Sequence, residues 1–166
     1  MLVEVRVAGL AVDPQTNMPI ILLQEPDKQD ILPIWIGIFE ASAIATQMEK
    51  IQIARPMTHD LLRNIMDQLG GVLLRIEITE VKENTFFSHL VVRKASNEDI
   101  QIDSRPSDAI ALALRCNAPI LVESSLIERT AQAAQQMQLK NQSKTAEEWE
   151  ELLKNMSDDS FGKYKM

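Results

Sequence analysis

The stretch from Ile102 to Arg115 (IDSRPSDAIALALR) places a group of polar side chains directly before a helix that has no polar face. From Ala109 to Leu114 every side chain is Ala, Ile or Leu, so apolar atoms cover its whole circumference. A helix of this kind is stable only when other elements cover it on more than one side. Because Pro106 suits the first turn of a helix, we expect a central, buried helix that begins near residue 105.

The N-terminal end of this helix is the first candidate for a functional site. Asp103, Arg105 and Asp108 fall within six residues, beside Ser104 and Ser107. Serine and aspartate are also ordinary capping residues, and an arginine beside carboxylates is often a satisfied ion pair. The density of charge at one end of a buried helix favours a functional site over capping alone, although both interpretations are open.

The chain before this stretch is expected to form three strands followed by two helices. Alternating valines, a turn-rich segment and an apolar run predict a hairpin, and Pro33 suggests that the third strand lies at an edge of the sheet or starts irregularly. Apolar residues then recur at helical spacing in two segments, and Thr58 is the predicted N-cap of the second. The predicted strands are residues 2–12, 18–23 and 31–37, and the predicted helices are residues 40–51 and 58–69.

The same order of elements repeats after Gly70 and Gly71. The segment from Val5 aligns with the segment from Leu74, and ASAIA from Ala41 aligns with SDAIA from Ser107. The repeat predicts strands at residues 72–81, 85–93 and 99–103, and helices from about 105 and from about 124 to 137. The sequence therefore predicts an α+β fold with a duplicated three-strand/two-helix unit (residues 1–70 and 71–138) and a mostly antiparallel sheet packed around the central helix.

Length and composition predict one domain over residues 1–138 and a polar tail over residues 139–166. Within the tail, Thr145 to Met156 has the pattern of a short amphipathic helix. No apolar run approaches the ~20 residues that span a bilayer, so we expect no membrane segment and a cytoplasmic location. Cys116, the single cysteine, ends an apolar helix and is expected to be a buried, inert thiol.

The net charge of −7 argues against a protein that holds nucleic acid through a large basic face. It does not argue against a nuclease. An enzyme needs only transient contact with its substrate, and acidic side chains can recruit a divalent metal ion that supplies positive charge at the phosphate.

A second polar group lies between the two helices of the first half. It comprises Arg55, Thr58, His59 and Asp60, with Glu40 at the start of the preceding helix. Adjacent residues on a helix diverge by ~100°, so His59 and Asp60 need not face the same site. The other histidine, His89, falls in a predicted hairpin strand and is expected to be structural or on the surface.

Three strings in this order, LPIWIGIFEASAIA, RPMTHDLL and IDSRPSDAIALALR, resemble the bifunctional nuclease domain family over residues 1–138. Members of this family are small proteins of bacteria and plants that degrade both DNA and RNA without marked base preference. The resemblance implies a duplicated α+β fold and nuclease activity. The motif positions that carry over are Glu40, Arg55, Pro56, Thr58, His59, Asp60, Asp103, Arg105, Pro106, Ser107 and Asp108.

Phosphodiester hydrolysis requires an activated water and charge stabilisation at phosphorus, which carboxylates holding Mg²⁺ or Mn²⁺, an arginine and a histidine can supply. The candidate metal ligands are Glu40, Asp60, Asp103 and Asp108. The candidate catalytic residues are His59, Asp60, Asp103, Arg105 and Asp108, with His59 as base or acid. Arg55, Arg105 and Ser107 are the candidate substrate-binding residues.

Two other functions fit the same residues. The polar groups could belong to a binding or regulatory module that holds a small anion or a partner protein, or they could brace the two halves by ion pairs. If the protein is a nuclease, DNA and RNA are its transient substrates. Apolar strands such as residues 18–23 and 31–37 also predict a homodimer or another homo-oligomer, because exposed apolar surface usually marks an interface.

Overall fold

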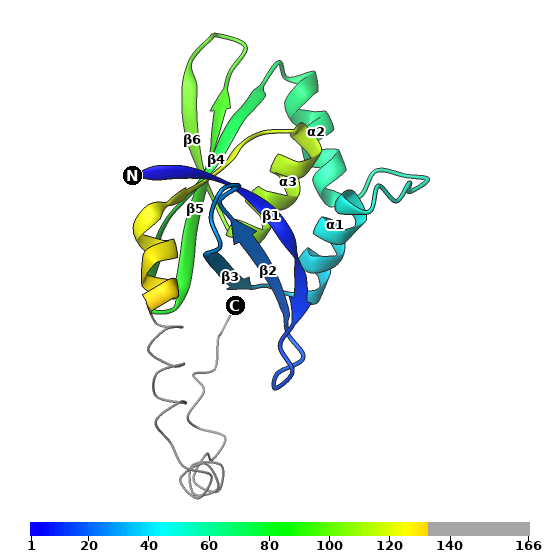
Figure 1. The fold of residues 1–166 in the computed structure, drawn as a ribbon. Helices are drawn as coiled ribbons and strands as arrows, with labels where there is room; N and C mark the ends of the chain where they lie inside the picture. The colour runs from blue at the N-terminus through cyan, green and yellow to red at the C-terminus, as the bar shows by residue number, and fades with distance from the viewer. Residues whose placement is uncertain (133–166) are drawn as a thin grey trace, which may run out of the picture.

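The computed structural model describes residues 1–132, which form an α+β fold (Figure 1). Seven strands in this part of the chain make one sheet in the order β3-β2-β1-β7-β4-β5-β6. Five of the six strand pairings are antiparallel, and β4 with β7 is parallel. Figure 1 shows α1, α2 and α3 grouped to one side of the strands, with the helix over residues 124–132 on the other side.

Apart from β7, the elements lie close to the predicted ones, although α1 begins two residues and ends three residues before the predicted helix over 40–51. The strands are β1 (Leu2–Val12), β2 (Pro19–Gln24), β3 (Ile31–Trp35), β4 (Val72–Lys82), β5 (Thr85–Arg93), β6 (Asp99–Ser104) and β7 (Ile120–Glu123). The helices are α1 (Ile38–Met48), α2 (Thr58–Gln68) and α3 (Pro106–Cys116), and residues 124–132 are also helical. None of the helices described is long and apolar enough to cross a membrane. The predicted tail lies outside the described residues.

Local turn chemistry accounts for the two long hairpins. In the turn between β1 and β2, the Asp13 carboxylate accepts hydrogen bonds from the Gln15 backbone and from the Trp35 indole. Between β4 and β5, Glu83 and Asn84 have φ values of 47° and 59°, the left-handed conformation of a tight turn that matches strand twist. Both predicted hairpins are therefore confirmed.

Of the two alternatives that Pro33 raises, the edge position is confirmed, because within residues 1–132 β3 pairs only with β2 at the end of the sheet. A proline has no N–H to donate to a neighbouring strand, so it is tolerated at an edge.

Strand β7 was not predicted. Its four residues lie between β1 and β4 and pair with both, so that the N-terminal strand is joined to the second half of the chain. Ile120 and Val122 are buried, but four residues are too few for alternation to distinguish a strand from a loop. The two halves share the order of three strands and a helix, and their common origin by duplication remains a prediction.

Helix α3 is the central, buried helix that its composition predicts. Each residue from Ala109 to Ala113 is at most 1% exposed. The helix packs against α1, α2, β4 and β5, so its whole circumference is covered. Polar side chains at either end of α3 are therefore held between several elements.

The apolar face of α2 is largely uncovered. Leu61, Leu62, Ile65 and Leu69 are between 44% and 74% exposed, and α2 contains no buried residue. Only Met66 on this helix packs against the core, where it is partly buried. In contrast, the apolar strands expected to leave an interface place Ile21, Leu23 and Leu32 in the core. Exposed apolar side chains thus gather on α2, and others lie outside it, among them Ile38 and Phe39 on α1.

Candidate functional site

The first turns of α1, α2 and α3 meet and bring together side chains from both halves of the chain. Asp108 Oδ1 lies 3.0 Å from His59 Nε2, and Asp108 Oδ2 accepts a hydrogen bond of 2.7 Å from Arg105 Nε. Arg105 Nη1 lies 2.9 Å from Glu40 Oε1. These four residues, Glu40, His59, Arg105 and Asp108, form one connected group, called here the helix-start cluster.

Asp108 does not cap α3. The N-cap residue is Arg105, whose side chain makes no capping hydrogen bond, and the two oxygens of Asp108 contact His59 and Arg105 instead. Burial opposes ionisation of Asp108, but the hydrogen bonds from Arg105 and His59 outweigh it, so the pKa of Asp108 lies below its ordinary value. The Asp108 carboxylate is therefore held charged between two possible cations.

The lowered pKa predicts how Asp108 contributes to stability. An unfolded aspartate has a pKa of about 3.9, so below this pH the unfolded chain binds a proton that the folded chain resists. The contribution is present above that pKa and is lost as the pH falls through the lower, folded value. We expect Asp108→Asn to flatten the decrease in Tm below about pH 4, measured by circular dichroism. Asp27→Asn, an exposed site without an ion pair in residues 1–132, should leave that slope unchanged, and equal slopes in all three proteins would contradict the prediction.

A pocket of about 180 Å³ opens beside the helix-start cluster. It lies between the end of β3, the turn between β4 and β5, and the start of α3. Its lining includes Ile34, Gly37, Glu40, Phe86, Arg105 and Ser107. Ser107 is buried, whereas the Arg105 side chain is 60% exposed and within reach of a ligand from solvent. Of the predicted substrate-binding residues, Arg105 and Ser107 thus share this pocket.

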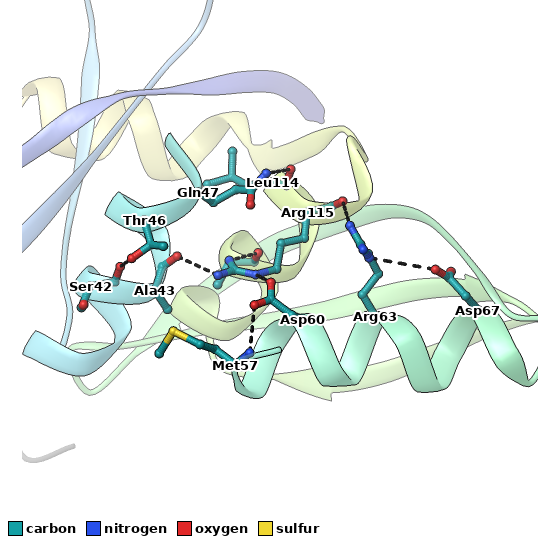
Figure 2. Close-up of polar contacts among 11 residues, drawn as sticks. Ser42, Ala43, Thr46, Gln47, Met57, Asp60, Arg63, Asp67, Leu114 and Arg115 are labelled. Carbon is teal, nitrogen blue, oxygen red and sulfur yellow. Dashed lines mark hydrogen bonds and ion pairs between the residues drawn. The ribbon is translucent and has the colours of Figure 1, made fainter. Parts of the chain in front are cut away.

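Asp60 lies in a separate network around Arg115 (Figure 2). The Arg115 side chain is 2% exposed, and its Nε donates to Asp60 Oδ1 at 2.6 Å. Its two terminal nitrogens donate to the carbonyl oxygens of Ala111 and Ala43, so one guanidinium joins α1, α2 and α3. The other Asp60 oxygen accepts from the Met57 backbone N–H at 2.9 Å.

The backbone hydrogen bond from Met57, together with Arg115, outweighs burial and holds the pKa of Asp60 below its ordinary value. Met57 is the N-cap of α2, one residue before the predicted Thr58. Asp60 therefore fixes the start of α2, and it does not join the helix-start cluster.

Asp103 is also placed away from the helix-start cluster. In the register of β5 and β6, Asp103 lies opposite His89, and the next pair is Ile102 with Leu90. Successive side chains on a strand point to opposite faces, and Leu90 belongs to the core that contains α3. Asp103 thus faces the other side of the sheet. There His89 contacts the buried Glu77 at 2.8 Å, in keeping with its expected structural role.

The four predicted metal ligands do not form one group. Glu40 and Asp108 lie on either side of the Arg105 guanidinium, whereas Asp60 and Asp103 lie elsewhere. Over residues 1–132, no three His, Cys, Asp or Glu side chains are placed so that they could together hold a metal ion. A site with four protein ligands is therefore not assembled here.

Arg115 is the residue that sequence reasoning missed. It follows Asp108 by seven positions, and residues with this spacing lie on the same face of a helix. A charged residue in the last turn of an otherwise apolar, buried helix was the available signal, because such a charge must have partners. Cys116 beside it is partly buried, not fully buried as predicted, and burial raises the pKa of its thiol.

Comparisons with known proteins agree with the resemblance carried by the three motifs. The family model for the bifunctional nuclease domain matches residues 21–135. An uncharacterized protein of Mycobacterium tuberculosis is 40% identical over 124 residues, which cover 75% of this chain and 73% of that protein. Bifunctional nuclease 1 of Arabidopsis thaliana is 31% identical over 109 residues (64% of this chain), and Bifunctional nuclease 1 of Oryza sativa subsp. japonica is 30% identical over 112 residues (66% of this chain). The matched part covers 34% of each plant protein.

Proposed function

Because the chain belongs to the bifunctional nuclease domain family, we propose that its helix-start cluster hydrolyses phosphodiester bonds in DNA and RNA with low sequence specificity. The observation that carries the proposal is the pairing of His59 with Asp108 at 3.0 Å, with Arg105 on the other oxygen of the same carboxylate. An oriented histidine beside an exposed guanidinium combines a proton acceptor with a phosphate-binding group.

The contact with Asp108 selects which nitrogen of His59 acts. If Nε2–H of the neutral imidazole donates to Asp108, Nδ1 remains as the acceptor for a proton from the attacking water. The water oxygen then bonds to phosphorus, the bond from phosphorus to the leaving oxygen breaks, and the proton on Nδ1 passes to that oxygen. Asp108 stabilises the imidazolium that exists between these two proton transfers.

Arg105 supplies the contact with the substrate. Nε and Nη1 of its guanidinium contact Asp108 and Glu40, which hold it in place, and the remaining N–H donors can bind the non-bridging oxygens of a phosphate. Contacts to phosphate fix the position of a strand but carry no direct information about its bases. Low sequence specificity follows from recognition of this kind.

A divalent metal ion fits this cluster only together with a substrate. Mg²⁺ is commonly held by one or two carboxylates and substrate phosphates, and Glu40 and Asp108 are the carboxylates that flank the proposed phosphate position. When bound, the ion would neutralise charge that develops on the phosphate oxygens.

Cleavage of single-stranded DNA and RNA by highly purified protein tests both parts of the proposal. We expect cleavage with Mg²⁺ or Mn²⁺ and its loss in chelator, while calorimetry with Mg²⁺ alone should show no tight binding, because the protein offers too few ligands. Full activity in chelator would refute the metal assistance. Binding without cleavage under every condition would refute the nuclease and favour a binding module.

We also expect the protein to form a homodimer through the exposed face of α2. Leu62→Glu combined with Ile65→Glu places two charges in this apolar surface and should give a monomer, measured by light scattering at tens of micromolar protein. Val12→Glu, at an exposed apolar residue of β1, is the matched control and should leave the dimer intact. A wild-type monomer at these concentrations would contradict the prediction.

A further inference from the structure

A second pocket, of about 290 Å³, lies between the end of α1, the loop over residues 49–57, the start of α2 and the end of α3. Three arginines line it, Arg55, Arg63 and Arg115, and Asp60 is the one carboxylate among its lining residues. In a chain with a net charge of −7, this is a local excess of positive charge. It is called here the arginine pocket.

Two of the three guanidiniums have donors to spare. Arg115 uses all three of its nitrogens on Asp60 and two carbonyl groups, so it contributes mainly its charge. Arg63 donates one bond of 3.3 Å to the Arg115 carbonyl oxygen, as Figure 2 shows. Its Nε is buried and lies 4.0 Å from Asp67 Oδ2, too far for a hydrogen bond. Arg55 is exposed and makes no hydrogen bond or ion pair with any residue from 1 to 132.

These donors suit an oxyanion. Guanidinium groups bind phosphate through pairs of parallel N–H···O bonds, and two guanidinium groups that line the same pocket can bind the same phosphate group. The side-chain amide of Asn64, which also lines the pocket, offers further donors. A bound phosphate would give Arg55 a partner and would add to the one hydrogen bond and the 4.0 Å contact with Asp67 that Arg63 makes within the protein.

The arginine pocket and the helix-start cluster lie on either side of the first turn of α2. His59 reaches Asp108 and the next residue, Asp60, reaches Arg115. Asp108 and Arg115 are seven residues apart on α3, which corresponds to about 10 Å along the helix axis. Along a duplex, where successive nucleotides of one strand rise by 3.4 Å, this span corresponds to roughly three nucleotides, and an extended single strand covers it in fewer.

We infer that the arginine pocket binds a phosphate of the same nucleic-acid strand whose cleaved phosphate lies at Arg105. The inference rests on the proposed function, and it adds a second contact point a few nucleotides from the bond that breaks. Because this contact is to a phosphate, it lengthens the recognised segment without adding base specificity.

The test compares the binding of short and long oligothymidylates, because only the long one can reach both positions. Unlabelled two-nucleotide and six-nucleotide strands compete with a labelled strand in fluorescence anisotropy, with chelator present to suppress turnover. We expect Arg55→Ala and Arg63→Ala to weaken binding of the six-nucleotide strand roughly tenfold or more, and to leave binding of the two-nucleotide strand unchanged. The slope of log K against log salt is negative, and it should become less negative by about 0.7 for each phosphate that the variant no longer neutralises.

Arg6→Ala is the matched control, because Arg6 is an exposed arginine on β1 without a hydrogen bond or ion pair in the part of the chain that the structure describes. It should change neither affinity nor slope. Equal weakening for both strand lengths would overturn the inference, since Arg55 would then act at the cleaved phosphate. No weakening would overturn it as well, and so would competition by inorganic phosphate when neither oligothymidylate competes. A length effect that depends on Arg55 in a protein that cleaves nothing would uphold this strand-binding site and refute the nuclease.

Discussion

His59→Ala should lower the rate of cleavage of single-stranded DNA and RNA by roughly 10²–10⁴-fold, the usual contribution of a positioned general acid or base. Asp108→Asn should lower it by a similar factor, because it keeps the size of the side chain but removes the charge that holds both His59 and Arg105. Initial rates with labelled strands give the comparison, and circular dichroism establishes that the variants are folded.

Asp99→Asn provides the matched control for the Asp108 variant. Asp99 also pairs with an arginine, Arg93, but on the exposed surface of β5 and β6. The control should cleave like the wild type.

Asp103→Asn distinguishes the prediction made from the sequence from the one made from the structure. The sequence predicts a loss of activity, whereas the position of Asp103 on the other side of the sheet predicts none. Equal activity in all these proteins would point to a contaminating nuclease or to another site.

Arg115→Met should lower the free energy of unfolding by about 3 kcal/mol. The substitution keeps the apolar stem but leaves the Asp60 carboxylate and two carbonyl oxygens without their donor. Since α2 contains no buried residue, its start depends on Arg115 and on the contact between His59 and Asp108. We therefore expect the rate of cleavage to fall as well, because the start of α2 no longer holds His59 in its position beside Asp108.

Urea denaturation at neutral pH measures this change, with Arg93→Met as the control. Arg93 is paired with Asp99 at the exposed surface, where an ion pair contributes at most about 1 kcal/mol. If the two substitutions cost the same, the network around Arg115 is not the main link between the three helices.

The parts of the fold that could be predicted are those encoded by neighbouring residues. Alternation and turn residues predict the hairpins of β1 with β2 and of β4 with β5. The composition of residues 109–114 predicts a buried helix, and α3 is that helix. Strand β7 could not be predicted in the same way, because its identity depends not on its own pattern but on two distant partners, β4 and, more than a hundred positions away, β1.

The candidate site shows the same limit. Asp103 and Asp108 are close in sequence, and so are His59 and Asp60, but closeness along the chain does not set the direction of a side chain. Asp103 leaves a strand toward the other face of the sheet. Asp60 leaves α2 toward Arg115, about a third of a turn from His59. The residues that do meet, Glu40 and His59 with Arg105 and Asp108, come from opposite halves of the chain, and no local pattern indicates which of them will pair.

The central position of β7 also affects how this chain can mature on the ribosome. Leu2 to Val5 can pair with Ile120 to Glu123 only after the latter have been synthesised, so the middle of the sheet forms late. Until then, β1 and β4 each expose an unpaired edge, and such edges recruit strands from other molecules. Long-range pairing of this kind slows folding, since the cost of closing a long loop precedes the gain from contacts. Nascent chains that stop before Ile120 should therefore be the aggregation-prone species. Once β7 has left the ribosome, it should pair with β1 and β4 and complete the sheet.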